Sequence, residues 1–210
     1  MGPTVIDLRE YIRDVPDFPK PGILFRDVTP LLQSANAFRA AVDAIAEPFK
    51  NDGVDFVVGI DARGFVIGAP VALALDAGFV MVRKKGKLPG ETLKASYDLE
   101  YGTDHVEMHA DSFGKGAKVL IVDDLIATGG TCAATLALVR ETGAEIVGCS
   151  FPDRAQGARR PQGAGCGTHP RAARLLAAGT AATAAARPSY WSASSQAPAT
   201  SAKAVTPRTH

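Results

Sequence analysis

Helical spacing of apolar residues stands out first between residues 34 and 50. Ser34 precedes the pattern and is a suitable N-cap, because its side chain can accept a hydrogen bond from the first helical turn. The apolar positions, three or four residues apart, are Phe38, Val42, Ile45 and Phe49. This pattern predicts an amphipathic helix over 34–50.

Two further stretches have the composition of helices. The apolar run over 65–75 ends shortly before Gly78, and the stretch over 131–142 ends at Gly143. Glycine is favoured directly after a helix because it adopts the left-handed conformation without a steric penalty. We therefore predict helices over 65–75 and 131–142.

Short apolar runs lie between these helices and predict buried strands. They cover 56–60, 79–82, 118–122 and 146–151. Runs of this length without polar alternation are typical of parallel strands that are covered on both faces. Strands that alternate with helices indicate an α/β fold, with a central parallel sheet and helices on its faces.

The middle of the chain has a different pattern. Residues 83–104 are rich in Lys, Gly and Pro and predict a long loop, and loops of that length inside a domain are usually functional. Residues 105–109 alternate between polar and apolar types. This alternation predicts a half-exposed strand with His105 and His109 facing solvent.

The composition is that of a soluble globular domain. The chain has 210 residues, of which 46% are hydrophobic, enough for a buried core. No stretch approaches the ~20 apolar residues of a membrane span, and the charged N-terminus does not resemble a signal peptide. We therefore expect a cytoplasmic protein without a membrane partner, whose three widely spaced cysteines are reduced.

Charge is distributed unevenly along the chain. Residues 152–210 hold eight basic residues and one acidic residue, a net charge of +7, whereas residues 1–151 hold 15 basic and 21 acidic residues, a net charge of −6. The final segment is also poor in large apolar residues, so it cannot bury enough surface to offset its chain entropy. We predict a domain over 1–151 and a disordered, low-complexity basic tail over 152–210.

The strand predicted over 118–122 leads into the sequence VLIVDDLIATGGT, residues 119–131. Two adjacent carboxylates, Asp123 and Asp124, follow the strand, where ligands bind in open α/β sheets. Small residues then lead directly into a helix, so backbone N–H groups and the helix N-terminus can hold a phosphate. The residues of this predicted phosphate loop are Ala127, Thr128, Gly129, Gly130 and Thr131.

The two carboxylates indicate what lies beside the phosphate. They would repel a phosphate group, but they can accept hydrogen bonds from ribose hydroxyls or hold Mg²⁺. A ribose 5-phosphate with a metal-bound leaving group, that is, a phosphoribosyl diphosphate, satisfies both halves of the motif. The dinucleotide-binding pattern GxGxxG and the P-loop pattern GxxxxGK[ST] are both missing from the sequence.

Residues 119–131 resemble the phosphoribosyl diphosphate motif of type I phosphoribosyltransferases. Three other segments resemble the adenine-specific members of that family, and the whole resemblance is collinear over roughly residues 5–151. These segments are DFPKPGILFRDVTPLL (17–32), DARGF (61–65) and VRKKGKLPGETLKASYDLEYG (82–102). The resemblance implies the type I phosphoribosyltransferase fold, with a small base-binding hood over 1–33 and a flexible lid loop over 83–104.

The resemblance also implies roles for single residues. It places the diphosphate against the DARG loop, where Arg63 and backbone amides face it. It places the purine near Leu24 and Arg26, where backbone groups read its edge and an apolar side chain covers its face. By the hydrophobic pattern alone, Leu24 and Phe25 would be core residues.

Further roles follow from the resemblance for the lid. Its basic residues would hold the diphosphate, Glu100 would be the catalytic acid or base near the purine N7 or N9, and Tyr101 would help to close the site. The basic residues concerned are Arg83, Lys84 and Lys87. The resemblance further implies a homodimer in which such residues can serve the partner's site.

These assignments predict an enzyme of purine salvage. It would transfer 5-phosphoribosyl from phosphoribosyl diphosphate to adenine, yielding AMP and diphosphate, with Mg²⁺ bound through the substrate or by Asp123 and Asp124. One alternative is a phosphoribosyltransferase for xanthine or a 6-oxopurine, which the ILFRD and LPGETL segments disfavour. Another is an inactive regulator that binds phosphoribosyl diphosphate, although residues 1–30 lack a helix-turn-helix pattern and the scattered arginines predict no specific nucleic-acid partner.

The sequence departs from the family after Phe151. It reads FPDRAQGARRPQGAGCGTHP where the family has an apolar and acidic strand and a further element that completes the purine pocket. One compatible coding sequence, with a single base removed after the Phe151 codon, yields Phe-Leu-Ile-Glu-Leu-Lys-Gly-Arg-Asp-Ala, which closely resembles the expected continuation. We hypothesise that the tail is translated out of frame, through a mutation or a sequencing error, which puts the activity of this chain in question.

Overall fold

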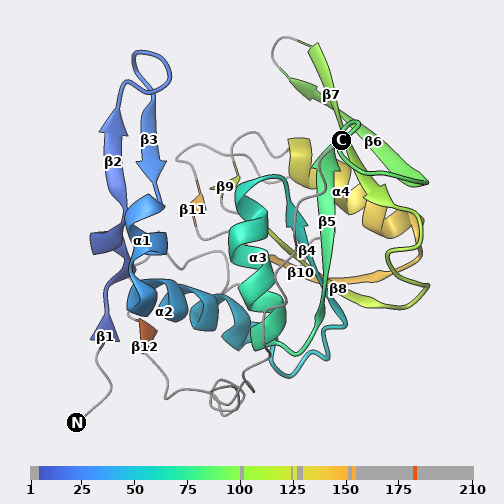
Figure 1. Cartoon of the computed structure of the whole chain (residues 1–210), viewed down its shortest axis with the longest axis horizontal. Coiled ribbons are helices and arrows are strands. Elements are labelled where there is room, and N and C mark those ends of the chain that lie inside the picture. Colours follow the sequence, from blue (N-terminus) through green and yellow to red (C-terminus); the bar gives the residue numbers. More distant parts are fainter. Residues whose placement is uncertain are drawn as a thin grey trace, which may run out of the picture.

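The computed structural model describes residues 5–99, 102–123, 125–126, 130–150, 153–154 and 182–183. At its centre lies a six-stranded sheet with the strand order β10-β8-β4-β5-β7-β6 (Figure 1). The strands are β4 (Phe56–Ile60), β5 (Gly78–Lys84), β6 (Thr92–Leu99), β7 (Gly102–His109), β8 (Lys118–Val122) and β10 (Glu145–Ser150). The four strands β10, β8, β4 and β5 are parallel, and β7 and β6 extend the sheet in antiparallel fashion.

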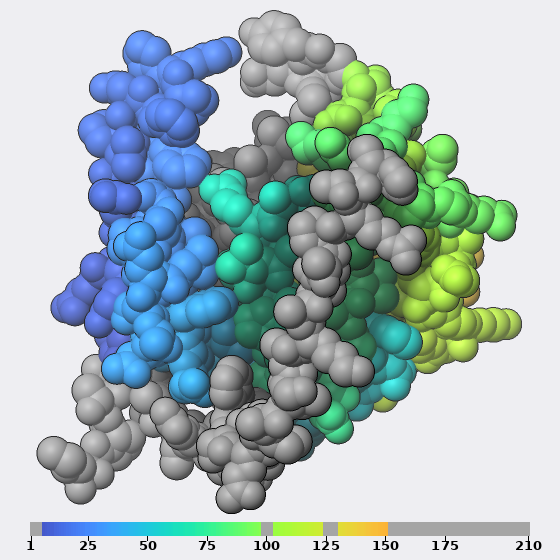
Figure 2. Space-filling view, viewed as in Figure 1, coloured from blue at the N-terminus to red at the C-terminus, as the bar shows by residue number. Residues whose placement is uncertain are grey.

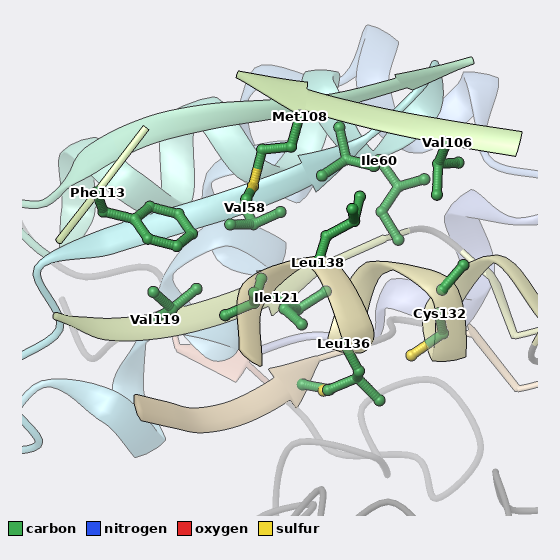
Figure 3. Close-up of a cluster of buried hydrophobic side chains, with 14 residues drawn as sticks. Val58, Ile60, Val106, Met108, Phe113, Val119, Ile121, Cys132, Leu136 and Leu138 are labelled. Carbon is green, nitrogen blue, oxygen red and sulfur yellow. The ribbon is translucent and has the colours of Figure 1, made fainter. Parts of the chain in front are cut away.

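Helices cover both faces of the parallel part of the sheet. α3 (Arg63–Ala74) and α2 (Ala35–Ala46) pack on one face, and α4 (Gly130–Glu141) packs on the other. Along β4, Val57 therefore belongs to the core below α3, whereas Val58 belongs to the core below α4. Figure 3 shows this second core, in which side chains of the sheet meet those of α4. The predicted α/β fold is confirmed.

The helices and strands predicted over 34–82 and 118–151 agree with the structure to within a few residues at their ends. Ser34 is the N-cap of α2, and its Oγ atom accepts a hydrogen bond from the N–H of Ala37 at 3.3 Å. The last predicted turn of that helix is instead the 3₁₀ turn η2 (Glu47–Phe49). Pro48 lacks the N–H group that an α-helical hydrogen bond would need there.

The N-terminal unit (residues 5–33) contains elements that the hydrophobic pattern did not predict. These are η1 (Leu8–Tyr11), the antiparallel hairpin of β2 (Arg13–Pro16) and β3 (Leu24–Asp27), and the short helix α1 (Thr29–Gln33). Buried Leu8 and Leu31 join this unit to the alanine-rich side of α2. The hairpin stands beside the sheet (Figure 1), and in Figure 2 its upper half (dark blue) is set apart from the green atoms of the sheet.

The predicted long loop over 83–104 is wrong for most of its length. β5 continues to Lys84, and β6 pairs with β7 along Thr92–Leu99. The core-facing residues of β6 are Leu93, Ala95 and Tyr97. Their period of two was masked by the surrounding Lys, Gly and Pro residues. Residues 100–101 lie outside the described residues, so the role of this hairpin as a lid stays a prediction.

β7 is less exposed than the alternation over 105–109 predicted. His105 and His109 are half-buried rather than fully solvent-facing, and Glu107 between them is only 3% exposed. The neighbouring strands β5 and β6 flank β7 on both sides, and Lys94 of β6 lies against Glu107 on the predicted solvent face.

The tail contributes two short strands to the described structure. β11 (Asp153–Arg154) pairs with β9 (Leu125–Ile126), and β12 (Ala182–Thr183) pairs with β1 (Val5–Ile6). The prediction that the tail is disordered stays a prediction. The rest of 152–210 lies outside the described residues.

The described cysteines differ in redox state. Cys132 is a buried free thiol, and Cys149 is disulfide-bonded. The prediction that all three cysteines are reduced is therefore wrong for Cys149.

The described part of the chain contains no helix with the length and apolar character that crossing a bilayer would require.

Candidate active site

Predicted ligand-binding residues lie at one edge of the sheet, where β4 and β8 end. These two strands are parallel neighbours, with Gly59 beside Val122. After β4 the chain crosses through α3 to β5 on one side, and after β8 it crosses through α4 to β10 on the other side. Connections that leave in opposite directions open a crevice at the carboxyl ends of the strands, which is the usual ligand site of such sheets.

The DARG loop and Asp123 touch in that crevice. Gly64, in the first turn of α3, lies so close to the end of β8 that a Cβ atom there would be 3.0 Å from Oδ1 of Asp123 and 3.0 Å from the carbonyl oxygen of Val122. Asp123 is half-buried, and its backbone N–H donates to the carbonyl oxygen of Ser150 at 3.2 Å. Two motifs that are about 60 residues apart in the sequence therefore form one site.

We expect the Gly64→Ala substitution to destabilise this contact, because backbone atoms and a half-buried carboxylate leave no room for a methyl group. Overpacking of this kind costs about 1–3 kcal/mol of unfolding free energy. Urea unfolding measures the loss. Gly114→Ala is the matched control, since nothing lies within 4 Å of a Cβ atom there. Equal stability of the two variants would contradict the tight contact.

Arg63 connects this edge to the N-terminal hairpin. Its Cζ atom lies 5.6 Å from the centroid of the Phe25 ring, a distance at which cation–π attraction acts. Phe25 lies on β3 and meets Phe18 edge-on, with 5.2 Å between ring centroids. The hydrophobic pattern placed Phe25 in the core, and only the tertiary structure brings it to the candidate site.

Leu24 and Arg26 project from the other side of β3, because side chains alternate along a strand. Leu24 is 54% exposed, so the prediction that it is a core residue is wrong. Arg26 is half-buried and lines a cavity of about 210 Å³ together with Arg9, Ile12 and Asp14.

Arg83 is held by groups of the protein itself. Its Nε atom lies 3.3 Å from Oδ2 of Asp61, and its Nη1 atom donates to the carbonyl oxygen of Lys87 at 3.1 Å. The guanidinium also lies over the Phe65 ring, 5.9 Å from the centroid. Arg83 thus links the DARG loop to the turn after β5, and its role as a substrate ligand stays a prediction.

Lys84 and Lys87 lie in that turn and are exposed. The N–H of Lys87 donates to the carbonyl oxygen of Lys84 at 3.2 Å, and Gly86 between them has a φ of +75°. Glycine adopts this left-handed conformation readily. The turn therefore presents ammonium groups to solvent at the end of β5, the strand next to β4.

The first turn of α4 holds the described end of the phosphate loop. Gly130 and Thr131 are half-buried, and Thr131 forms a side-chain hydrogen bond with Tyr97 of β6. Burial raises the pKa of Tyr97, the bond with Thr131 opposes that rise, and the hydrogen bond from Tyr97 to Asp104 adds to it. Tyr97 was not among the predicted site residues, and the available signal was its place in the alternation of β6.

Cys132 lies in the same turn of α4, and the charge of Asp123 affects the pKa of its thiol. Burial and, to a smaller extent, the negative charge of Asp123 raise the pKa of the Cys132 thiol to about 12. A thiol with that pKa is protonated at neutral pH and is a poor nucleophile. The chemistry of the site therefore rests on other groups.

Six predicted site residues lie outside the described residues, and their roles stay predictions. They are Glu100, Tyr101, Asp124, Ala127, Thr128 and Gly129. Within the described ranges, no cluster of three or more His, Cys, Asp or Glu side chains could enclose a metal ion.

Known proteins are similar to this chain in sequence and in fold. Residues 27–163 match the phosphoribosyl transferase domain. The adenine phosphoribosyltransferase of Thermobifida fusca is 56% identical over 147 residues, which cover 70% of this chain and 82% of that protein.

Solved structures agree with the sequence match. The adenine phosphoribosyltransferase of Rhodothermus marinus is 55% identical with a TM-score of 0.66, over 70% of this chain and 84% of that one. The enzyme of Saccharomyces cerevisiae, in complex with adenine and D-2,5-dideoxy-2,5-imino-altritol 1,6-bisphosphate, is 42% identical with a TM-score of 0.67, over 70% and 86%. The predicted type I phosphoribosyltransferase fold is confirmed, and the chain belongs to the phosphoribosyltransferase family, among the adenine phosphoribosyltransferases.

Proposed function

We propose that this chain transfers the 5-phosphoribosyl group of phosphoribosyl diphosphate to adenine, giving AMP and diphosphate in purine salvage. The observation that carries the proposal is the contact between the DARG loop and Asp123 in the crevice at the ends of β4 and β8. It joins a helix N-terminus suited to anions with a carboxylate suited to ribose hydroxyls. The ligands of the yeast relative, adenine and a bisphosphate, support the same ligand classes here.

The 5-phosphate and the ribose would bind along the motif 119–131. The N-terminus of α4 offers free backbone N–H groups and a positive dipole end to the phosphate. Its ligands would be Ala127, Thr128, Gly129, Gly130 and Thr131. Asp123 and Asp124 would accept hydrogen bonds from the ribose 2′ and 3′ hydroxyls, which also keeps the two carboxylates away from the phosphate.

The diphosphate would bind at the N-terminus of α3. Arg63 is exposed there, and the backbone amides of the DARG loop lie in the same turn. Lys84 and Lys87 add positive charge from the neighbouring turn, and Arg83 holds that turn against Asp61. Positive groups placed where charge accumulates stabilise the departing diphosphate more than the intact substrate.

The purine would lie between the hairpin β2–β3 and the crevice. Phe25 is the apolar side chain of β3 that approaches Arg63, and it would cover one face of the base. Backbone groups of Leu24 and Arg26 would read the purine edge. This placement leaves the base next to the C1′ position of a sugar held by Asp123.

The reaction itself is a displacement at C1′. The N9 lone pair of adenine forms a bond to C1′, the C1′–O bond to the diphosphate breaks, and its electron pair leaves with the diphosphate. Glu100 would take the proton that N9 gives up, and Tyr101 would help to exclude water from the reacting centre. In the sequence, both residues fall between the end of β6 and the start of β7, which supports the proposed role of this hairpin as the lid.

Mg²⁺ fits this set of residues as a partner of the substrate. It usually keeps several waters and binds one or two carboxylates together with substrate phosphates, rather than an all-protein cage. Asp123 is a half-buried carboxylate at the crevice, and it would hold the ion with Asp124, directly or through the ribose. Bound there, Mg²⁺ supplies positive charge that offsets the charge of the leaving diphosphate.

We further propose that the chain works as a cytoplasmic homodimer. Exposed apolar side chains on α3 and β5 support a second copy as the partner. They are Val66, Leu73 and Met81. Sedimentation equilibrium measures the assembly, and a monomer at every protein concentration would contradict it.

Diphosphate release tests the proposed reaction. The purified chain is given phosphoribosyl diphosphate and Mg²⁺ with adenine, hypoxanthine, xanthine or orotate. We expect release with adenine. Release with hypoxanthine and not with adenine would overturn the substrate. No release with any of the four bases, together with calorimetric binding of phosphoribosyl diphosphate, would favour an inactive binding protein whose C-terminal part is incomplete.

The Glu100→Gln variant is expected to lower kcat by about 100-fold or more, because general acid–base catalysis contributes that much. KM values for both substrates should change little, since glutamine has nearly the same shape. Glu91→Gln is the control, because Glu91 is an exposed glutamate just before β6. Unchanged turnover in Glu100→Gln would remove the assignment.

A further inference from the structure

Four charged residues lie in one row across four adjacent strands. Asp61 directly follows β4, beside Arg83 of β5, whose Nε atom is 3.3 Å from its carboxylate. Arg83 pairs in register with Glu107 of β7, and Glu107 pairs with Lys94 of β6. The charges therefore alternate in sign from the DARG loop to the outer edge of the sheet.

Glu107 is the buried member of this row. Its side chain is 4% exposed, its Oε2 atom accepts a hydrogen bond from the N–H of Gly86 at 2.9 Å, and its Oε1 atom lies 3.5 Å from Nζ of Lys94. A carboxylate is costly to bury unless it is both charge-paired and hydrogen-bonded. In Glu107, Oε1 is paired with the Lys94 charge and Oε2 accepts the hydrogen bond from Gly86. The buried carboxylate is therefore bound to the turn that contains Gly86.

Side chains hold that turn, residues 84–87, at two points. Glu107 holds its middle through the Gly86 amide, and Arg83 holds its end through the carbonyl oxygen of Lys87 at 3.1 Å. Three of its four residues are lysines, whose like charges repel one another. The two side-chain anchors add to the backbone hydrogen bonds of the turn, and they oppose this repulsion next to the DARG loop.

We propose that Glu107 is a positioning residue for diphosphate binding, which fixes the turn 84–87 so that its lysines face the leaving group as one preorganised unit. Glu107 itself would not touch the substrate. This inference rests on the proposed function, because it takes the diphosphate as the ligand of Arg63 and the turn.

Two substitutions of Glu107 separate its hydrogen bond from its charge. Glu107→Gln keeps an acceptor for the Gly86 amide and removes the charge, whereas Glu107→Leu removes both. Met108→Val is the matched control, because Met108 is a buried residue on the α4 face of β7 that pairs in register with Leu93 of β6 and lies in the core rather than at the turn. This substitution should lower the stability of the chain and leave the conformation of the turn unchanged.

Steady-state kinetics in the full-length chain give the first test. We expect Glu107→Leu to raise KM for phosphoribosyl diphosphate about tenfold and Glu107→Gln about threefold, with kcat and KM for adenine within about twofold of the parent values. Met108→Val should leave all three within about twofold. An unchanged KM for phosphoribosyl diphosphate in Glu107→Gln overturns the inference, and this isosteric variant remains informative where Glu107→Leu does not fold.

Amide hydrogen exchange gives a second test that needs no catalysis. The Gly86 amide should exchange at least about tenfold faster in Glu107→Leu than in the parent chain, about threefold faster in Glu107→Gln, whose neutral oxygen is a weaker acceptor than a carboxylate, and at nearly the parent rate in Met108→Val. Equal exchange rates of the Gly86 amide in all four chains would overturn the claim that Glu107 anchors the turn. If the parent chain releases no diphosphate with adenine, the proposed function fails. Calorimetric titration with Mg²⁺ and inorganic diphosphate then decides the inference alone: weaker binding by Glu107→Gln supports it, and equal binding overturns it.

Discussion

The Asp123→Asn variant is expected to lower kcat/KM for phosphoribosyl diphosphate by about 100-fold or more. Asp123 ends β8 and touches the DARG loop at Gly64, so it lies between the sugar and the diphosphate ends of the candidate site. Asparagine keeps the shape but loses the negative charge, and its amide group donates where the ribose hydroxyls also donate. Steady-state kinetics with each substrate varied in turn measures the effect.

Asp111→Asn is the matched control for this variant, because Asp111 is an exposed aspartate in the turn after β7. The fold of Asp123→Asn should stay intact, since the hydrogen bond from residue 123 to Ser150 is made by the backbone. Removing the charge should also lower the pKa of Cys132, because burial remains while the nearby anion is gone. A kcat/KM within about threefold of the parent value would contradict the ribose-binding role.

Replacement of the tail by the alternative reading frame is expected to have the second large effect. Deleting one base after the Phe151 codon should stabilise the chain by about 3 kcal/mol, which corresponds to a rise in Tm of about 6–12 °C at this chain length. β10 is the edge strand of the six-stranded sheet. At its end, the Oγ atom of Ser150 is buried without a hydrogen-bond partner among the described residues. The family-like continuation would supply strand pairing and apolar contacts there.

Thermal unfolding and the diphosphate-release assay, applied to both chains, measure this gain. A third chain that ends at residue 154 is the control, because it separates removal of the present tail from addition of the new segment. We expect only the chain with the alternative frame to gain both stability and turnover. Equal Tm values in the three chains would contradict the structural argument, and resequencing of the gene that confirms the present frame would contradict the out-of-frame origin.

Local patterns were sufficient where one residue type dominated a stretch. The buried strands over 56–60 and 118–122 agree with the structure because continuous apolar runs of that length have few other stable conformations. The motif 119–131 indicated a sugar phosphate because its chemistry is local: acids, small residues and a helix start follow one another directly.

Composition gave wrong predictions of secondary structure and burial where polar and apolar positions were mixed. The segment 83–104 was predicted to be a loop because its Lys, Gly and Pro residues outweighed the alternation of Leu93, Ala95 and Tyr97. Leu24 was predicted to be buried, but a two-stranded hairpin covers too little surface to bury a side chain on both of its sides.

By itself, the sequence determined the alternating strands and helices of the parallel sheet and the family, and it indicated the phosphate-binding motif, since each of these depends on neighbours along the chain. Only the tertiary structure decided that Gly64 packs against Asp123, that Phe25 approaches Arg63, and that Glu107 holds the turn 84–87. These contacts join residues about 20 to 60 positions apart, and they depend on strand register and on the packing of α3 against the sheet, which no local pattern encodes.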